Sequence, residues 1–309
     1  MRPRERVARA AAAVLKRVAR ARGYDLVPRD IYSPIPDVPP EHDPLWESPA
    51  SLVGVEFDLD EQLRLLETEL RPYLAEFSPP ATAAAEDAFY VWNGYYQAVD
   101  ADVLYAMVRH LKPRRILEIG SGYSTLVTAA ACSRNRGEGH ASVFTAVDPG
   151  PRAAIKPPPD GPDRFLRTTA QELPLETFLE LGRGDLLFVD SSHAVKLGSD
   201  VNFLVLEVLP RLRPGVVVHF HDIFLPYEYP RDWYERGTFV AEQYLLHAFL
   251  IDSTSYEVFF AAHAVARAHR DRLAELIPSL GARSDHYPAA FWMLRTCAPG
   301  PGSGTGGRS

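Results

Sequence analysis

Arg115-Ile-Leu-Glu-Ile-Gly-Ser-Gly-Tyr-Ser-Thr125 is the stretch that decides the fold of this chain. Its apolar residues Ile116, Leu117 and Ile119 form a short run, β-branched in part, that ends at a Gly-Ser-Gly sequence. A run of this length and composition is typical of a buried parallel strand. The glycines predict that this strand turns sharply into a helix.

The glycine turn is a candidate ligand-binding site. Gly120 and Gly122 would let the backbone approach a bound molecule closely, because glycine has no side chain to intervene. Ser124 or Thr125 is expected to cap the helix that continues through Cys132.

Strands and helices alternate from residue 114 onward, which predicts an α/β domain with crossover connections and a mostly parallel sheet. Helices are expected at 100–110, after the fourth strand, and at 239–250. The expected strands are 115–119, 142–147, 164–168, 185–189, 216–221, 256–260 and 291–294.

The region before this domain predicts a mainly helical N-terminal extension over residues 1–90. Residues 1–22 hold eight lysines and arginines and one acid, with apolar residues at helical spacing, which indicates a basic amphipathic helix. We favour packing of this helix on its own domain or on a neighbouring subunit; the alternatives are an anionic membrane surface and an acidic partner. A proline-rich connector at 33–49 and a surface helix near 60–77 follow.

Composition and charge argue against several classes of protein. A net charge of −7 over 309 residues argues against a general nucleic-acid binder, and no apolar run approaches the length of a membrane span. The N-terminus lacks a convincing signal peptide. The two cysteines, Cys132 and Cys297, are isolated, which favours a reducing, cytoplasmic location and argues against a zinc site.

Polar residues follow the apolar strands where each strand stops. In an open parallel sheet, ligands bind outside the carboxyl ends of the strands, where the strand order reverses. The residues expected at those ends are Gly120 to Gly122, Asp148, Ala170 and Gln171, Asp190 to His193, and His221 and Asp222.

Three residues indicate the ligand of the glycine turn. Asp148, at the end of the second strand, can accept both hydroxyl hydrogens of a ribose. Thr125 stands where a dinucleotide-binding fingerprint has its third glycine. Glu118 would repel a pyrophosphate but attract an amino group. S-adenosylmethionine, which has an amine and a sulfonium and no phosphate, fits this pattern better than a dinucleotide.

The motif 116–125 resembles motif I of the class I S-adenosylmethionine-dependent methyltransferases. The resemblance continues through Ala146-Val-Asp148-Pro, 185–193 with Asp200, and 212–222, and covers roughly residues 100–296. It is greatest to the bacterial macrocin-type sugar and small-molecule O-methyltransferases and more distant to the catechol and caffeoyl-CoA types. It implies a Rossmann-like, seven-stranded, mostly parallel sheet with helices on both faces and one antiparallel strand at 291–294.

The resemblance implies a methyltransferase domain over 91–297 and assigns roles within it. Glu118 and the backbone of 120–122 would hold the methionine part of the cofactor, Asp148 the ribose, and Ala170 and Gln171 the adenine. The predicted cofactor-binding residues are Glu118, Gly120, Ser121, Gly122, Ser124, Thr125, Asp148, Ala170, Gln171 and Asp190. The Gly-rich tail, 298–309, is predicted to be disordered.

Methyl transfer to a hydroxyl requires that the acceptor lose its proton, and the sequence offers two devices. Asp190 and Asp222 would hold Mg²⁺ or another divalent cation, although Ile223 stands where catechol-type enzymes have an asparagine ligand. Alternatively, His221 or His193 is a general base beside a carboxylate such as Asp222.

Some of these residues have simpler explanations. His219 is expected to be a core residue, whereas His221 at the strand end is expected to be functional. Asp148 would otherwise form a turn with Pro149. Residues 224–234, rich in aromatics, would form an acceptor wall through Tyr227, Tyr229 and Trp233, or a hydrophobic plug or dimer contact.

The sequence therefore predicts an O-methyltransferase acting on a small-molecule or carbohydrate acceptor, with a homo-oligomer allowed. The rival hypotheses are an NAD-dependent oxidoreductase and a non-catalytic S-adenosylmethionine-binding module of a larger assembly. The acceptor's identity is not encoded in any motif.

Overall fold

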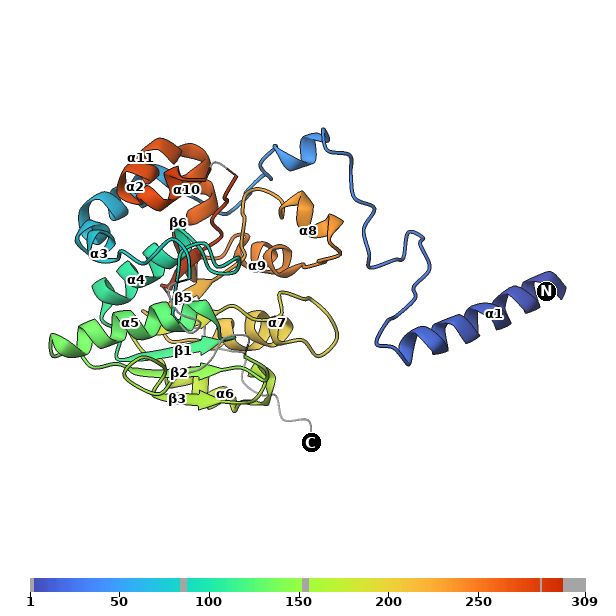
Figure 1. Cartoon of the computed structure of the whole chain (residues 1–309), viewed down its shortest axis with the longest axis horizontal. Coiled ribbons are helices and arrows are strands. Elements are labelled where there is room, and N and C mark those ends of the chain that lie inside the picture. The colour runs from blue at the N-terminus through green and yellow to red at the C-terminus, as the bar shows by residue number, and fades with distance from the viewer. Residues whose placement is uncertain (1–2, 84–87, 152–155, 284, 297–309) are drawn as a thin grey trace.

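The structure is a computed structural model that describes residues 3–83, 88–151, 156–283 and 285–296. Cys297 and the predicted tail, 298–309, lie outside the described residues. Figure 1 shows a layered body built around one sheet, and a single helix, α1 (Pro3–Arg20), that stands apart from it.

A seven-stranded sheet forms the centre of the body, in the order β3-β2-β1-β4-β5-β7-β6. β7 runs antiparallel to both of its neighbours, and the other pairings are parallel. The predicted strand set and its single reversed strand are confirmed. The strands are β1 (Arg115–Ile119), β2 (Val143–Val147), β3 (Arg164–Leu166), β4 (Leu186–Val189), β5 (Val217–Phe220), β6 (Tyr256–Ala261) and β7 (Phe291–Arg295).

The strand order reverses between β1 and β4. From β1 the chain builds outward through β2 to β3, then returns to place β4 on the other side of β1. The register aligns Ile119 with Val147 on one side and Val189 on the other, so the three strands end together. The residues that follow these three ends therefore meet at one edge.

Helices cover both faces of the sheet, as predicted, because alternate strand residues point to opposite sides. Ile116 and Phe188 belong to the apolar core on the face covered by α4 and α5, whereas Leu117 and Val189 belong to the core on the other face. The helices of the body are α4 (Asp100–Leu111), α5 (Tyr123–Gly137), α6 (Leu175–Leu179), α7 (Asp200–Phe203), α8 (Arg231–Glu235), α9 (Glu242–Leu250), α10 (Ala262–Ala268), α11 (Arg270–Leu276) and α12 (Pro278–Gly281).

The helix expected near 60–77 forms as α2 (Leu59–Leu65), a π-helical turn η2 (Leu66–Leu70) and α3 (Arg71–Glu76). Asp58 caps its start, as predicted, by accepting a hydrogen bond from the Glu61 N–H. Leu66, Leu70 and Leu74 are buried in the same core as the sheet residue Ile116. This part of the N-terminal extension is therefore packed into the body.

A buried arginine joins three helices on this side of the sheet. Arg109 of α4 pairs with Glu76 of α3 at 2.9 Å and with Glu138, just after α5, at 2.6 Å. It also donates to Asn135 of α5. The hydrogen bond from Arg109 is the main reason that the pKa of Glu76 falls to about 2. Arg109 thereby fixes α5, which follows the glycine turn, against α4.

Helix α1 forms where the basic amphipathic pattern predicts it. Val14, Leu15 and Val18 on this helix are exposed, at 59%, 60% and 47%. The favoured packing of the helix on its own domain is not found, and the segment between α1 and η1 (Pro44–Trp46) is extended and largely exposed (Figure 1).

Candidate active site

The glycine turn follows β1 and lies against Asp190, the residue that follows β4. Gly120 has a φ of +90°, and a Cβ placed on it would lie 1.8 Å from the backbone oxygen of Asp190. Both facts require glycine at this position. Gly122 is extended, and no described atom lies within 4 Å of an added Cβ, so its side of the turn is open to a ligand.

The predicted cap of the following helix is wrong by two or three residues. Helix α5 begins at Tyr123, so Gly122 is the capping position, and Ser124 and Thr125 lie in the first turn. Thr125 Oγ1 instead accepts a hydrogen bond from the Gly122 N–H at 3.0 Å, which fixes the glycine turn from inside the helix.

Glu118 lies beneath the turn with its side chain fully buried. Oε1 accepts hydrogen bonds from Ser124 Oγ at 2.6 Å and Thr125 Oγ1 at 3.1 Å, while Oε2 has no partner among the described residues. Burial raises the pKa of this carboxyl to about 8. An unpartnered buried carboxyl oxygen disfavours an approaching phosphate and would be satisfied by an ammonium group.

Asp148 is brought to the glycine turn as predicted. Its Oδ2 accepts hydrogen bonds from the Ser121 N–H at 2.8 Å and from Ser121 Oγ at 2.9 Å. Its Oδ1 accepts from the Gly150 N–H at 2.7 Å, so the simple turn considered as the alternative role is also present. Each carboxylate oxygen has two lone pairs, so Oδ2 is fully used and Oδ1 retains one lone pair for a ribose hydroxyl.

Ala170 and Gln171 follow β3 in the short helix η3 (Ala170–Glu172). Ala170 is buried, while Gln171 is exposed and donates to the Gly198 oxygen at 3.2 Å. Both residues therefore lie after a strand end on the same edge of the sheet as the glycine turn.

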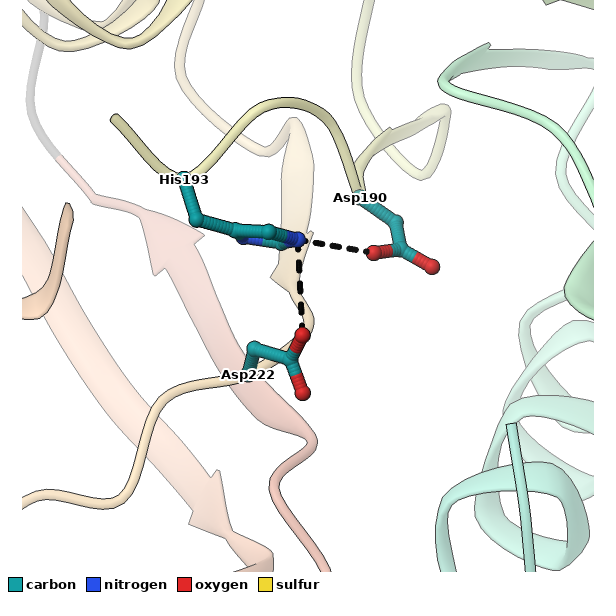
Figure 2. A group of neighbouring side chains, drawn as sticks. All are labelled: Asp190, His193 and Asp222. Carbon is teal, nitrogen blue, oxygen red and sulfur yellow. Dashed lines mark ion pairs between the residues drawn. The ribbon is translucent and has the colours of Figure 1, made fainter. Parts of the chain in front are cut away.

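Four residues after β4 and β5 form a compact group, which we call the acid–histidine centre: Asp190, His193, His221 and Asp222. His193 Nε2 lies 3.4 Å from an oxygen of Asp190 and 3.4 Å from an oxygen of Asp222 (Figure 2). His221 Nδ1 lies 3.5 Å from each of the same two carboxylates. The sequence prediction brought together these four residues, and the structure places them in contact.

Each histidine of the centre is held from behind by a second, buried carboxylate. Glu242, the first residue of α9, contacts His193 Nδ1 at 2.8 Å, and Asp100, the first residue of α4, lies 3.3 Å from His221 Nε2. Asp100 is itself fixed by the backbone N–H groups of Ala289 and Ala290. Neither acid was predicted, because each precedes an apolar helix and reads as an ordinary helix start.

The centre and the two acids behind it together hold four carboxyl groups and two histidines, and their charges shift one another's pKa. Burial alone would lower the pKa of His193 and of His221, but the surrounding carboxylates raise both well above the usual value. Burial opposes ionisation of Asp190, yet the two histidines hold its pKa below the usual range. Burial raises the pKa of Asp222.

The predicted cation ligands Asp190 and Asp222 acquire a third partner in the structure. One donor atom from each of Asp190, His193 and Asp222 lies within 4.8 Å of the others. Two carboxylates and one imidazole suit a divalent cation of the Mn²⁺ kind, since Mg²⁺ prefers oxygen donors alone. The donor set therefore fits a divalent cation, with His193 as a third possible ligand beside the two carboxylates.

His219 is a core residue, as expected. It is fully buried, with Nε2 2.9 Å from Tyr96 Oη and its ring stacked on Trp292 at 4.2 Å. Burial lowers its pKa to about 3. The ring of Tyr96 also packs on His221, at 4.6 Å, so the aromatic segment before α4 supports the centre.

Part of the aromatic loop 224–234 is buried in a small apolar cluster. Tyr229 is buried with Phe224, and its hydroxyl accepts a hydrogen bond from the Gln243 N–H at 2.8 Å. Tyr229 is therefore not available to stack on an acceptor, which corrects that expectation in favour of the hydrophobic plug. Trp233 packs against the same cluster.

Comparison with known proteins agrees with this geometry. Residues 117–223 match a family model described as a methyltransferase domain. An uncharacterized protein of Archaeoglobus fulgidus is 31% identical over 117 residues, which are 36% of this chain and 52% of that protein. The chain thus spans about half the length of this curated relative.

Solved structures of the protein CmcI are also similar. CmcI N160 with SAH has 16% identity and a TM-score of 0.37, over 73% of this chain and 91% of that one. CmcI D160 with Mg and SAM has 14% identity and a TM-score of 0.36, over 90% and 100%. The segment matched by the family model contains the glycine turn, Asp148 and the acid–histidine centre. Residues 117–223 are thus similar to a methyltransferase domain, and they lie in a seven-stranded, mostly parallel α/β sheet with one antiparallel strand.

Proposed function

We propose that this protein transfers the methyl group of S-adenosylmethionine to a hydroxyl of a small-molecule or carbohydrate acceptor. The observation that carries the proposal is the contact between Gly120 and the Asp190 backbone, which places the acid–histidine centre directly beside the glycine turn. A donor seated on the turn and an acceptor at the centre would then meet at one edge of the sheet.

The turn supports an adenosyl donor through charge as well as shape. The buried Oε2 of Glu118 has no hydrogen-bond partner among the described residues and can accept one from a ligand, while the carboxylate of Asp148 accepts from Ser121 and disfavours a phosphate. The amine of S-adenosylmethionine suits the first and a ribose hydroxyl suits the second. Ser121 N–H and Oγ hold Asp148 in place for that role.

His221 is the group that we assign to accept the proton of the acceptor hydroxyl. Asp100 holds Nε2, so the ring exchanges its second proton at Nδ1, which faces the centre. Against the effect of burial, the carboxylates raise the pKa of His221 and favour the protonated ring; a cation bound by Asp190 and Asp222 would offset their charge and leave Nδ1 able to accept a proton. Nδ1 has no hydrogen-bond partner in the described part of the chain. The acceptor oxygen then attacks the methyl carbon, the carbon–sulfur bond breaks, and the sulfonium leaves as a neutral thioether.

His193 has the opposite arrangement, which suits a ligand. Its Nδ1 is held by Glu242 and its Nε2 faces Asp190 and Asp222. This is the orientation in which a carboxylate fixes a metal-ligating imidazole. A divalent cation bound there would act as a Lewis acid that lowers the pKa of the acceptor hydroxyl. The sequence left a bound cation and a histidine base as alternatives. In this proposal they use different residues: His193 would bind the cation, and His221 would be the base.

The donor is tested by isothermal titration of the full chain with S-adenosylmethionine and S-adenosylhomocysteine. We expect micromolar binding of both and a loss of at least about tenfold in Asp148→Ala, since a charge-assisted hydrogen bond to the ribose disappears. The proposal fails if neither compound binds, or if Asp148→Ala binds as the unchanged protein does.

The roles of the histidines are tested by radioactive methyl transfer to a panel of phenols and glycosides. We expect EDTA to lower the rate and Mn²⁺ to restore it in the unchanged protein, and His221→Ala to stay slow in Mn²⁺. A rate indifferent to EDTA, with His221→Ala inactive, would leave the histidine base and remove the cation from the proposal.

A further inference from the structure

Helix α1 is the part of the chain that the proposed methyltransferase activity does not explain. It extends from Pro3 to Arg20 and makes no layer of the body (Figure 1). Val14, Leu15 and Val18 fall on one side at helical spacing and are all exposed. An isolated helix with an exposed apolar stripe lacks the tertiary packing that normally stabilises it.

Exposed apolar surface is concentrated in the arm formed by α1 and the segment that follows it. Of the 21 large apolar residues that are exposed in the described chain, 12 lie between Val14 and Val53. Ile31 and Tyr32, in the segment after the helix, are 91% and 86% exposed. The other nine are spread from residue 95 to residue 287. A clustered patch of this kind marks a binding surface, whereas scattered residues do not.

The charge of the arm is opposite to that of the rest of the chain. Residues 1–22 contain eight of the 33 lysines and arginines and one of the 40 acids, which gives +7 for these residues and leaves −14 for the remainder of the chain. Lys16 and Arg17 are exposed, while Arg20 pairs with Asp25 at 2.7 Å. At helical spacing, these three basic residues lie opposite the apolar stripe.

A second copy of the chain is a poor occupant for this surface. Pairing of residues 1–22 from two copies would bring +7 against +7, which opposes it. An arm on the body of another copy would gain attraction from the charge, but the described body offers only scattered apolar residues to cover the stripe. The occupant must be both anionic and apolar.

We propose that α1 lies on the surface of a bilayer that contains anionic phospholipids. Such a surface supplies acyl chains for Val14, Leu15 and Val18 and negative charge for Lys16 and Arg17. No helix of the described chain is long and apolar enough to cross a membrane, so the contact is peripheral. The acidic body is repelled by the same surface, and the proline-containing connector, residues 21–43, holds it away.

The test is sedimentation of the full-length protein with vesicles of phosphatidylcholine, with and without phosphatidylglycerol. We expect binding only when phosphatidylglycerol is present, and release by rising salt. Lys16→Gln with Arg17→Gln should weaken binding about 30-fold, at roughly fivefold for each charge near an anionic surface. Leu15→Glu with Val18→Glu should abolish binding.

Matched controls lie on the body. Leu206→Glu changes a leucine of similar exposure, and Arg236→Gln removes an exposed arginine; neither should alter vesicle binding. Circular dichroism establishes that the variants keep their fold.

Three results would overturn the proposal. The first is the absence of binding to either vesicle, and the second is equal binding to both. The third is a dimer, seen by light scattering without lipid, that the α1 substitutions dissociate; this would assign the arm to a second copy.

Discussion

His193 Nδ1 lies 2.8 Å from Glu242 Oε2, and Glu242 is wholly buried at the start of α9. The contact ties a residue of the loop after β4 to a helix that begins 49 residues later. Its consequence is that the imidazole orientation depends on an acid outside residues 117–223, the segment that matches the methyltransferase family model.

Replacing Glu242 by Gln should lower turnover by about 10- to 100-fold, the usual cost of losing a carboxylate that orients a ligand histidine. Binding of S-adenosylhomocysteine should change by less than about twofold, because Glu242 does not touch the glycine turn. Steady-state kinetics and titration separate the two effects, and Glu257→Gln, at an exposed position of β6, is the matched control. A loss of donor affinity equal to the loss of turnover would contradict the assignment.

The two glycines of the turn should respond differently to a methyl group. Gly120→Ala should cost at least about 2 kcal/mol of unfolding free energy, because it combines a positive φ with a clash against the Asp190 oxygen. Gly122→Ala meets no described atom and should cost about 1 kcal/mol or less, while it weakens donor binding. Urea denaturation measures both values. Equal costs would mean that the Gly120–Asp190 contact is not the constraint.

Arg109→Met should lower the unfolding free energy by about 2–4 kcal/mol, since it leaves Glu76 and Asn135 without their partner. The value lies below that of a wholly buried network, because Glu76 and Glu138 are partly exposed. Arg134→Met removes an exposed arginine and should cost less than about 1 kcal/mol. Denaturant melts of the two variants provide the comparison, and similar losses would refute the role of Arg109.

Acid should destabilise the protein over two overlapping ranges of pH, of which only the first extends above pH 4.5. The pKa of His219 is lowered to about 3, so the unfolded chain binds a proton more readily, and stability falls as the pH drops from 6.5 toward 3. The pKa of Glu76 is lowered to about 2, so its contribution is present above pH 4.5 and is lost between 4.5 and 2.

The variant His219→Gln should flatten a plot of melting temperature against pH between pH 6.5 and 4.5, and the contribution of Glu76 below pH 4.5 should remain. An unchanged slope between pH 6.5 and 4.5 would show that His219 titrates alike in the folded and unfolded chain.

Most of the fold was predictable from local patterns. The apolar run at 116–119 and its glycines predict a strand and a turn, and repetition of that pattern predicts the order of elements. Ser124 and Thr125 show the limit of this reasoning, because their hydroxyls suit a cap, yet Gly122 takes the capping position and they bond to Glu118 instead. Tertiary contacts decided between two locally acceptable arrangements.

Only those residues of the site that directly follow a strand were predictable from the sequence. Asp190, His193, His221 and Asp222 follow β4 and β5 directly, so the topology brings them together. Asp100 and Glu242 come from helix starts that are distant in sequence, and only the packing of α4 and α9 places them behind the histidines. The position of α1 depends on a surface outside the body, which the internal packing does not supply.

The backbone of Asp190 lies against Gly120, and the side chain of the same residue belongs to the acid–histidine centre. The glycine turn and the centre therefore share one residue. A donor that displaced the turn would also displace Asp190, whose carboxylate belongs to the centre. If the proposed donor and cation both bind and are coupled in this way, thermodynamic linkage requires that each change the other's affinity by the same factor.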